Sequence, residues 1–251
     1  MPRFLSAGYD IAYVDEGEGP PVLLLHGFAS SSRVNWVETG WVSALTRAGR
    51  RAIAMDLRGH GDSAKPMDVE AYALASLAED AARLLDHLAL SSADLMGYSL
   101  GARVAALTAI VHPPVARTLI LGGMAGGILR GLDQAEAIAA GLEASGIDAV
   151  GEPTARSFRA FAERTGSDRR ALAAAMRARR DVIAAADLAA LKLPILVVLG
   201  TADTLAGPID DIARLLPQAE LLPIAGRNHM NTVGDRAFKA AVLSFLDRAG
   251  R

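Results

Sequence analysis

A serine lies between two glycines in the stretch GYSLG (97–101), and residues elsewhere in the chain decide whether it could act as a nucleophile. A serine hydroxyl attacks a carbonyl only when a base within hydrogen-bond reach takes its proton, and a neutral histidine can do this. A carboxylate beside that histidine fixes its tautomer and stabilises its charged form. Because the G-x-S-x-G pattern is short, it indicates chemistry only in the right structural context.

The elements that would position such residues are visible as short apolar runs. They are VLLL (22–25), AIAM (52–55), ADLM (93–96), TLIL (118–121), ILVVL (195–199) and ELLPI (220–224). Consecutive apolar residues predict strands buried on both faces, as in a parallel sheet covered by helices. The half-polar segment 9–17 is typical of an edge strand or a hairpin arm.

Helical patterns alternate with these runs, over residues 74–88, 100–111, 208–216 and 235–248. The alternation predicts an α/β fold, with a mostly parallel central sheet covered by helices on both faces. Between residues 124 and 191 no strand is expected, and strong helix formers dominate. We therefore predict a core domain, residues 1–123 and 192–251, interrupted by a helical cap insertion, residues 124–191.

Ligands in open α/β sheets bind beyond the carboxyl ends of the strands. Ser99, Asp203 and His229 each follow a predicted strand, in that chain order. In these features the chain resembles the α/β-hydrolase superfamily, in particular its serine-nucleophile branch with a helical cap, which includes esterases and enol-lactonases. The resemblance implies that Ser99 is the nucleophile, Asp203 the acid and His229 the base.

The same resemblance implies an oxyanion hole made by the backbone N–H groups of Leu100 and Phe28. Gly97 and Gly101 would keep Cβ atoms away where strand and helix pass closely. An aspartate in place of Ser99 would have implied a dehalogenase or an epoxide hydrolase. The serine makes those branches unlikely.

Other residues compete for these roles. His26 and His60 also follow strands, where the family places loop-shaping histidines, and His87 and His112 lie in or at the end of helices. We expect all four to be structural or solvated.

Asp56 is the rival of Asp203 as the acid. Some members of the family carry the acid after the strand that follows the nucleophile helix, but residues 122–127 contain no carboxylate. This absence favours Asp203, and we expect Asp56 to organise its own loop with Arg58 and Ser63.

The substrate pocket should be apolar, lined by Phe28 and Met124, with Leu205 and Met230 as further neighbours. The cap aromatics Phe158 and Phe161 either reach this pocket or belong to the core. The cap also carries a cluster of arginines: Arg156, Arg159, Arg164, Arg169, Arg170, Arg177, Arg179 and Arg180. They could recognise a carboxylate-bearing substrate, but acids and bases balance over the whole insertion, which favours a solvated helix face.

Composition bounds the remaining possibilities. The formal net charge is −2 and no cysteine is present, which argues against a nucleic-acid partner, a disulfide framework and a thiolate metal site. No apolar run is long enough for a membrane span, and the first residues lack the apolar stretch of a signal peptide. We therefore expect a cytoplasmic monomer or homodimer that needs no metal or cofactor and acts on a small-molecule acyl substrate.

The predicted function is hydrolysis of a small-to-medium carboxylic ester or lactone through an acyl-enzyme. Two alternatives stay open on the same residues. One is C–C bond hydrolysis or cofactor-free perhydrolysis, and the other is a non-enzymatic small-molecule receptor.

Overall fold

The computed structural model describes residues 1–131, 134–178 and 183–250, and its centre is an eight-stranded sheet. The strands are β1 (Arg3–Ser6), β2 (Tyr9–Glu16), β3 (Pro21–Leu25), β4 (Arg51–Met55), β5 (Ala93–Tyr98), β6 (Ala116–Gly122), β7 (Ile195–Gly200) and β8 (Glu220–Ile224). Their order is β1-β2-β4-β3-β5-β6-β7-β8. The β1–β2 and β2–β4 pairs are antiparallel, and all other pairs are parallel.

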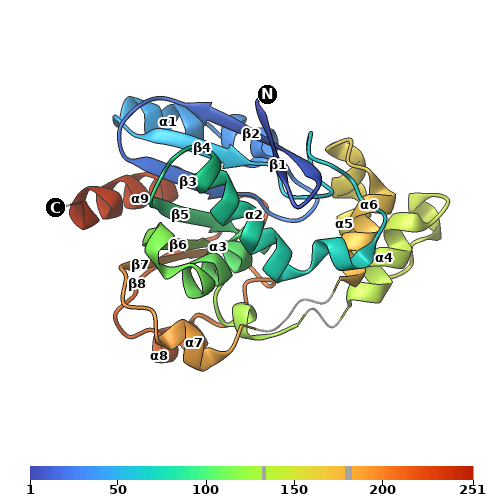
Figure 1. Cartoon of the computed structure of the whole chain (residues 1–251). Coiled ribbons are helices and arrows are strands. Elements are labelled where there is room, and N and C mark those ends of the chain that lie inside the picture. Colours follow the sequence, from blue (N-terminus) through green and yellow to red (C-terminus); the bar gives the residue numbers. More distant parts are fainter. Residues whose placement is uncertain (132–133, 179–182, 251) are drawn as a thin grey trace.

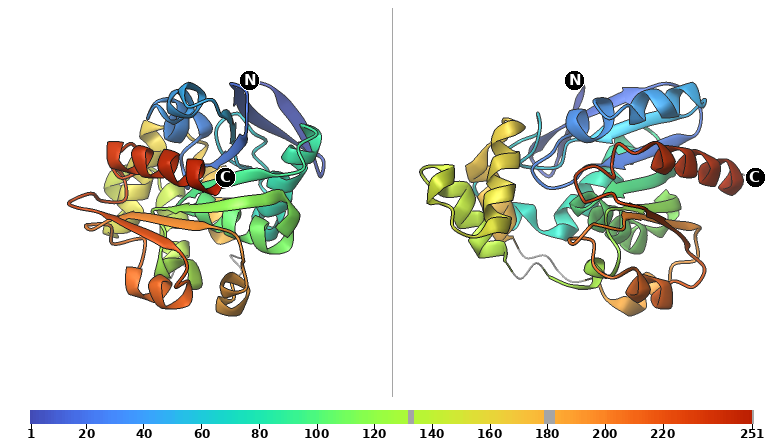
Figure 2. Two further views of the ribbon diagram at one scale, coloured as in Figure 1. Left: turned by 90° about the vertical axis from the view of Figure 1, so that its left-hand side faces the viewer. Right: turned by 180° about the vertical axis from the view of Figure 1, so that it is seen from behind.

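Helices cover both faces of this sheet (Figures 1 and 2). They are α1 (Trp41–Arg47), α2 (Leu74–His87), α3 (Leu100–Val111), α4 (Ala135–Glu143), α5 (Pro153–Arg164), α6 (Arg169–Arg177), α7 (Ala185–Ala189), α8 (Ile209–Leu215) and α9 (Arg236–Ala249). Successive residues of β3 alternate between two cores. Leu23 and Leu25 pack with α2 and α3, whereas Val22 and Leu24 pack with α1 and α9. The predicted fold class is therefore confirmed.

The six apolar runs form β3 to β8, but the expectation of burial on both faces is wrong for β8. Of its five residues only Ile224 is buried, because β8 is the last strand of the sheet and has a neighbour on one side alone. Segment 9–17 forms β2, which pairs with both β1 and β4 and is thus a hairpin arm. Strand β1 and helix α1 were not predicted.

The segment between β6 and β7 contains only helices and turns among its described residues. We call Ala135–Arg177, which holds α4, α5 and α6, the helical layer. Figure 1 shows it beyond one end of the sheet. Helices α5 and α6 begin at acidic caps, since Glu152 accepts the N–H of Ala155, and Asp168 accepts two N–H groups of the first turn of α6. The exact limits of the insertion, 124 and 191, stay a prediction.

Within residues 1–131, 134–178 and 183–250, no helix combines the length and the apolar character that crossing a lipid bilayer requires.

Candidate active site

Ser99 lies at the sharp turn between β5 and α3 with a backbone φ of 54° and ψ of −113°. A left-handed φ is costly for a residue with a side chain and marks stored strain. The turn is possible because two glycines flank it. A Cβ at Gly97 would overlap the backbone of Gly101, and a Cβ at Gly101 would overlap the carbonyl of Leu25. The strand and the helix therefore approach as closely as the sequence predicts.

Asp203 and His229 follow β7 and β8 and form a hydrogen-bonded pair. His229 Nδ1 lies 2.8 Å from Asp203 Oδ2. The other carboxylate oxygen accepts the N–H groups of Leu205 and Ala206 at 2.9 and 3.0 Å. The side chain of Asp203 is fully buried, and that of His229 is 15% exposed. The aspartate is thus held rigidly, while the other nitrogen of the imidazole can serve as a base.

Tyr98, beside the serine, connects the turn to the histidine loop. Its hydroxyl donates a 2.6 Å hydrogen bond to the carbonyl oxygen of His229, 131 residues away in the chain. Burial, together with the nearby charge of Asp203, raises the pKa of this hydroxyl, so that it remains a neutral donor. The sequence carried no signal for this contact.

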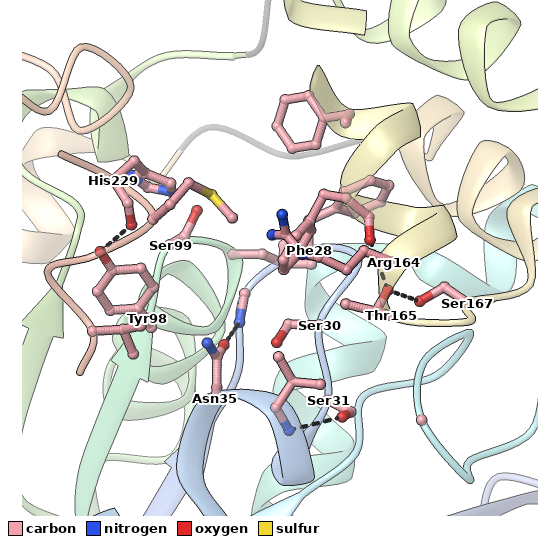
Figure 3. A pocket seen from close by; sticks show the side chains of 18 of the residues that line it. Phe28, Ser30, Ser31, Asn35, Tyr98, Ser99, Arg164, Thr165, Ser167 and His229 are labelled. Atoms are coloured by element: carbon pink, nitrogen blue, oxygen red, sulfur yellow. Dashed lines mark hydrogen bonds between the residues drawn. The ribbon is translucent and has the colours of Figure 1, made fainter. Parts of the chain in front are cut away.

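One cavity of about 1080 Å³ contains the predicted site. Ser99, His229, Leu100, Phe28 and Met124 all line it. Figure 3 shows Ser99 and His229 along one side of the cavity, with Phe28 opposite them.

The remaining predicted pocket residues also line this cavity. Leu205 and Met230 are exposed, so they lie at its rim and not in its interior. Phe158 and Phe161, from α5, line it as well and pack against the larger core. Both expectations for these aromatics therefore apply.

Both backbone polar groups of Gly27, the residue before Phe28, are held by side chains. Asn35 Oδ1 accepts the Gly27 N–H at 2.8 Å, and the Gly27 carbonyl lies 2.8 Å from His26 Nδ1. Because the peptide is planar and trans, fixing this carbonyl also fixes the direction of the Phe28 N–H. Asn35 belongs to a π-helical turn (Arg33–Val37), and sequence reasoning did not single it out.

His26 is neutral and has a defined tautomer. Its Nε2 accepts the N–H of Leu57 at 3.0 Å, so Nδ1 carries the proton and donates it to Gly27. Complete burial lowers the pKa of His26 to about 4. This is the loop-shaping role that was expected.

Asp56 organises its loop, but not with Arg58. Its carboxylate accepts the N–H groups of Ser32 and Asp62, and Ser63 donates to its carbonyl. Arg58 instead forms a buried bidentate pair with Asp80. The guanidinium is long enough to reach the aspartate of α2, so this part of the expectation was wrong.

The other histidines are not among the residues that line the cavity. His60 is buried beside His26, His87 stacks on Phe4, and His112 pairs with Glu79. In the part of the chain that the structure describes, no group of three or more His, Asp or Glu side chains could hold a metal ion.

Most of the described arginines of the predicted cap bond within the helical layer. Arg156 pairs with Asp148, Arg159 and Arg169 donate to carbonyls at the end of α4, and Arg177 pairs with Glu136 and Glu143. Arg170 is exposed, and Arg164 lines the cavity. Arg179 and Arg180 lie outside the described residues.

Comparison with known proteins agrees with this architecture. A family model described as alpha/beta hydrolase fold matches residues 20–125. A 2-hydroxymuconate semialdehyde hydrolase from Pseudomonas putida is 39% identical over 124 residues, which are 49% of this chain and 43% of that protein. The bifunctional epoxide hydrolase 2 of Sus scrofa is 33% identical over 46% of this chain and 20% of its own length. The matches thus span less than half of these curated relatives.

The structural match extends over the whole chain. The crystal structure of an enol-lactonase from Burkholderia xenovorans LB400 superposes with a TM-score of 0.82 at 23% identity, covering 98% of this chain and 100% of that one. At this identity the likeness shows the fold. Together with the family match over residues 20–125 and the sheet order, it shows that the chain has the α/β-hydrolase fold.

Proposed function

We propose that this protein is a serine hydrolase that cleaves small-to-medium carboxylic esters or lactones through an acyl-enzyme. The observation that carries the proposal is the arrangement at the cavity. Ser99 and His229 line the same space, and His229 is paired through Nδ1 with the buried Asp203. This pairing leaves Nε2 as the nitrogen that exchanges protons with the serine and the substrate.

In the proposed mechanism the Ser99 hydroxyl attacks the substrate carbonyl while His229 takes its proton. The negative oxygen of the tetrahedral intermediate accepts hydrogen bonds from the N–H groups of Leu100 and Phe28. Leu100 is the first residue of α3, a position whose N–H has no partner within the helix. The histidine then protonates the leaving alcohol, and water releases the acid by the same steps in reverse.

C–C bond hydrolysis is the second candidate, because the Pseudomonas putida relative carries the name of a semialdehyde hydrolase. The epoxide hydrolase likeness is not adopted, since the position between the two glycines is a serine. Cofactor-free perhydrolysis and a receptor role remain alternatives on the same residues. Turnover of an ester separates the receptor role from all the enzymatic ones.

Hydrolysis of p-nitrophenyl acetate and butyrate by the wild type and by Ser99→Ala tests the proposal. We expect Ser99→Ala to lower kcat by about a thousandfold or more, because the covalent route is lost. A fluorophosphonate probe should label Ser99, as mapped by peptide mass spectrometry. Equal rates in both proteins, or labelling at Ser63 instead, would show that the nucleophile is misassigned.

Asp203→Asn should lower kcat by about ten-thousandfold, because the amide favours the wrong imidazole tautomer. Asp56→Asn is the matched control, since Asp56 also follows a strand but its carboxylate accepts backbone N–H groups, those of Ser32 and Asp62. A larger loss in Asp56→Asn would transfer the role of the acid to that residue.

A further inference from the structure

Arg164 differs from most of its neighbours in the helical layer. It is the last residue of α5, it lines the cavity, and its guanidinium lies 5.0 Å from the centre of the Phe161 ring. Over the described ranges, no carboxylate forms an ion pair with it. Arg156, two turns earlier on the same helix, is instead paired with Asp148 and does not line the cavity.

Ser30 offers a second unused polar group in the same cavity. Its side chain is only 3% exposed, and its hydroxyl has no hydrogen-bond partner among the described residues. A buried hydroxyl without a hydrogen-bond partner costs free energy. A ligand oxygen that accepts a hydrogen bond from it would therefore bind favourably.

The end of α5 is held over the loop that carries Ser30. Thr165 donates to the carbonyl of Ala29 at 3.0 Å and interacts with Ser167 at 2.9 Å. Phe158 of α5 also packs edge-on against Phe28, with 5.7 Å between the ring centres. Figure 3 shows Arg164, Thr165 and Ser167 along the side of the cavity that the helical layer provides.

The charges around the cavity favour an anion. Among the lining carboxylates, Glu38 is paired with Arg33, Asp56 accepts backbone N–H groups, and Asp62 is exposed to solvent. Arg103, from the first turns of α3, is buried and donates to the carbonyls of Gly127, Ile128 and Arg130. In the described part of the chain, no carboxylate pairs with Arg103 or with Arg164, and Arg164 is exposed to solvent.

We propose that the substrate carries a carboxylate distant from the scissile carbonyl, bound by the guanidinium of Arg164 and the hydroxyl of Ser30. This inference rests on the proposed hydrolase function and names its substrate class. One guanidinium and one hydroxyl suit the two oxygens of a single carboxylate. The apolar stretch between that end and Ser99 would hold the carbon chain of the substrate.

The test compares each acidic ester with a neutral isostere. The substrates are the monomethyl esters of glutaric, adipic and pimelic acid and the same esters with the free acid converted to its amide, followed by methanol release. The wild type should prefer the best acid over its amide by about tenfold or more in kcat/KM. Arg164→Gln should abolish this preference through KM, and Arg164→Lys should restore part of it.

Arg156→Gln is the matched control, because it removes one arginine charge from the same helix without altering the cavity. It should keep the preference. An equal preference in Arg164→Gln and the wild type, or neutral esters favoured throughout by the wild type, would overturn the proposal while leaving the ester hydrolase function in place.

A binding measurement on a variant that lacks Ser99 tests the carboxylate site independently of ester hydrolysis. Adipic acid monoamide should bind Ser99→Ala about tenfold more tightly than it binds Ser99→Ala combined with Arg164→Gln, as measured by calorimetry. Equal affinities, or no heat in either protein, would contradict the carboxylate site. Loss of p-nitrophenyl acetate turnover in the wild type would instead contradict the hydrolase function.

Discussion

Several groups of the candidate site are held in place by neighbours that do no chemistry. Asp203 is fixed by two backbone N–H groups, and the loop of His229 is fixed by the hydroxyl of Tyr98. The N–H and the carbonyl of Gly27, the residue before Phe28, are held by Asn35 and His26, respectively. Positioning of this kind matters because reacting groups lose much of their effect when they are displaced by about 1 Å.

Tyr98→Phe should lower kcat for p-nitrophenyl acetate by about tenfold and leave KM nearly unchanged. The phenyl ring keeps the packing but cannot donate to the His229 carbonyl, so the histidine loop loses one fixed point. Steady-state kinetics measures the effect, as a loss in kcat at a nearly unchanged KM.

Tyr72→Phe is the matched control for that change. Tyr72 is as buried as Tyr98, and its hydroxyl also donates to a backbone carbonyl at 2.6 Å, that of Pro66, outside the cavity. Both variants should lose about 1 kcal/mol of folding stability. If Tyr72→Phe lowered kcat as much as Tyr98→Phe, the loss would reflect general destabilisation and not positioning.

At the scale of elements, the site depends on how closely α3 approaches β3. Gly101 is the second residue of α3, and a Cβ there would overlap the carbonyl oxygens of Leu25 and His26. Alanine has a better helix propensity than glycine by about 1 kcal/mol. Steric overlap must nevertheless prevail, since both obstacles are backbone atoms that no rotamer change can move.

Gly101→Ala should therefore destabilise the protein by about 3 kcal/mol or more, as measured by urea unfolding followed by circular dichroism. Gly146→Ala is the control, because Gly146 has an extended backbone and open space around its Cβ position. It should change stability by less than about 0.5 kcal/mol. A milder effect at Gly101 than at Gly146 would mean that α3 can move away from β3 at little cost.

The sequence predicted the elements whose patterns are local. Six apolar runs marked β3 to β8, and helical spacing marked α2, α3, α8 and α9. Burial on one or both faces of an element selects apolar residues in a pattern that can be seen in its own sequence. Strand β1 has only four residues and exists through pairing with β2, so its own sequence carries little signal. Ser99, Asp203 and His229 could be singled out as candidates because each follows a predicted strand.

Contacts between distant segments produce no such local pattern in the sequence. Three such contacts join different elements. Tyr98 bonds to the His229 loop, Asn35 accepts the Gly27 N–H, and Arg58 pairs with Asp80. The cap arginines could be counted in the sequence, but only the packing of α4, α5 and α6 separates those that bond internally from Arg164. Specificity is thus the property that depended most on the three-dimensional structure.

At the scale of the whole molecule, one buried histidine should set how stability changes in mild acid. His26 is completely buried, and its pKa is lowered from 6.5 to about 4 because burial disfavours its charged form. Protonation would also place a proton against the Leu57 N–H that Nε2 now accepts. The unfolded chain, in contrast, takes up this proton near pH 6.5.

The sign follows from this difference in proton binding. Above pH 6.5 neither state is protonated at His26, and its contribution to stability is fully present. As pH falls from 6.5 to about 4, the unfolded state binds a proton at His26 that the folded state does not bind. The free energy of unfolding therefore decreases. Glu79, Glu152 and Asp235 have lowered pKa values and lose their contributions only at lower pH.

Urea unfolding at pH 7.5 and pH 5 should therefore give a free energy of unfolding that is about 2 kcal/mol smaller at pH 5, from His26 alone. His26→Gln removes the titrating group while keeping a side chain of similar reach, and its stability should change much less between the two pH values, even if it starts lower. His87→Gln is the control, because His87 stacks on Phe4 away from the cavity lining, and it should retain the wild-type decrease. If His26→Gln lost as much stability as the wild type, the acid sensitivity would belong to other groups, and the neutral His26 that holds Gly27 would not be its source.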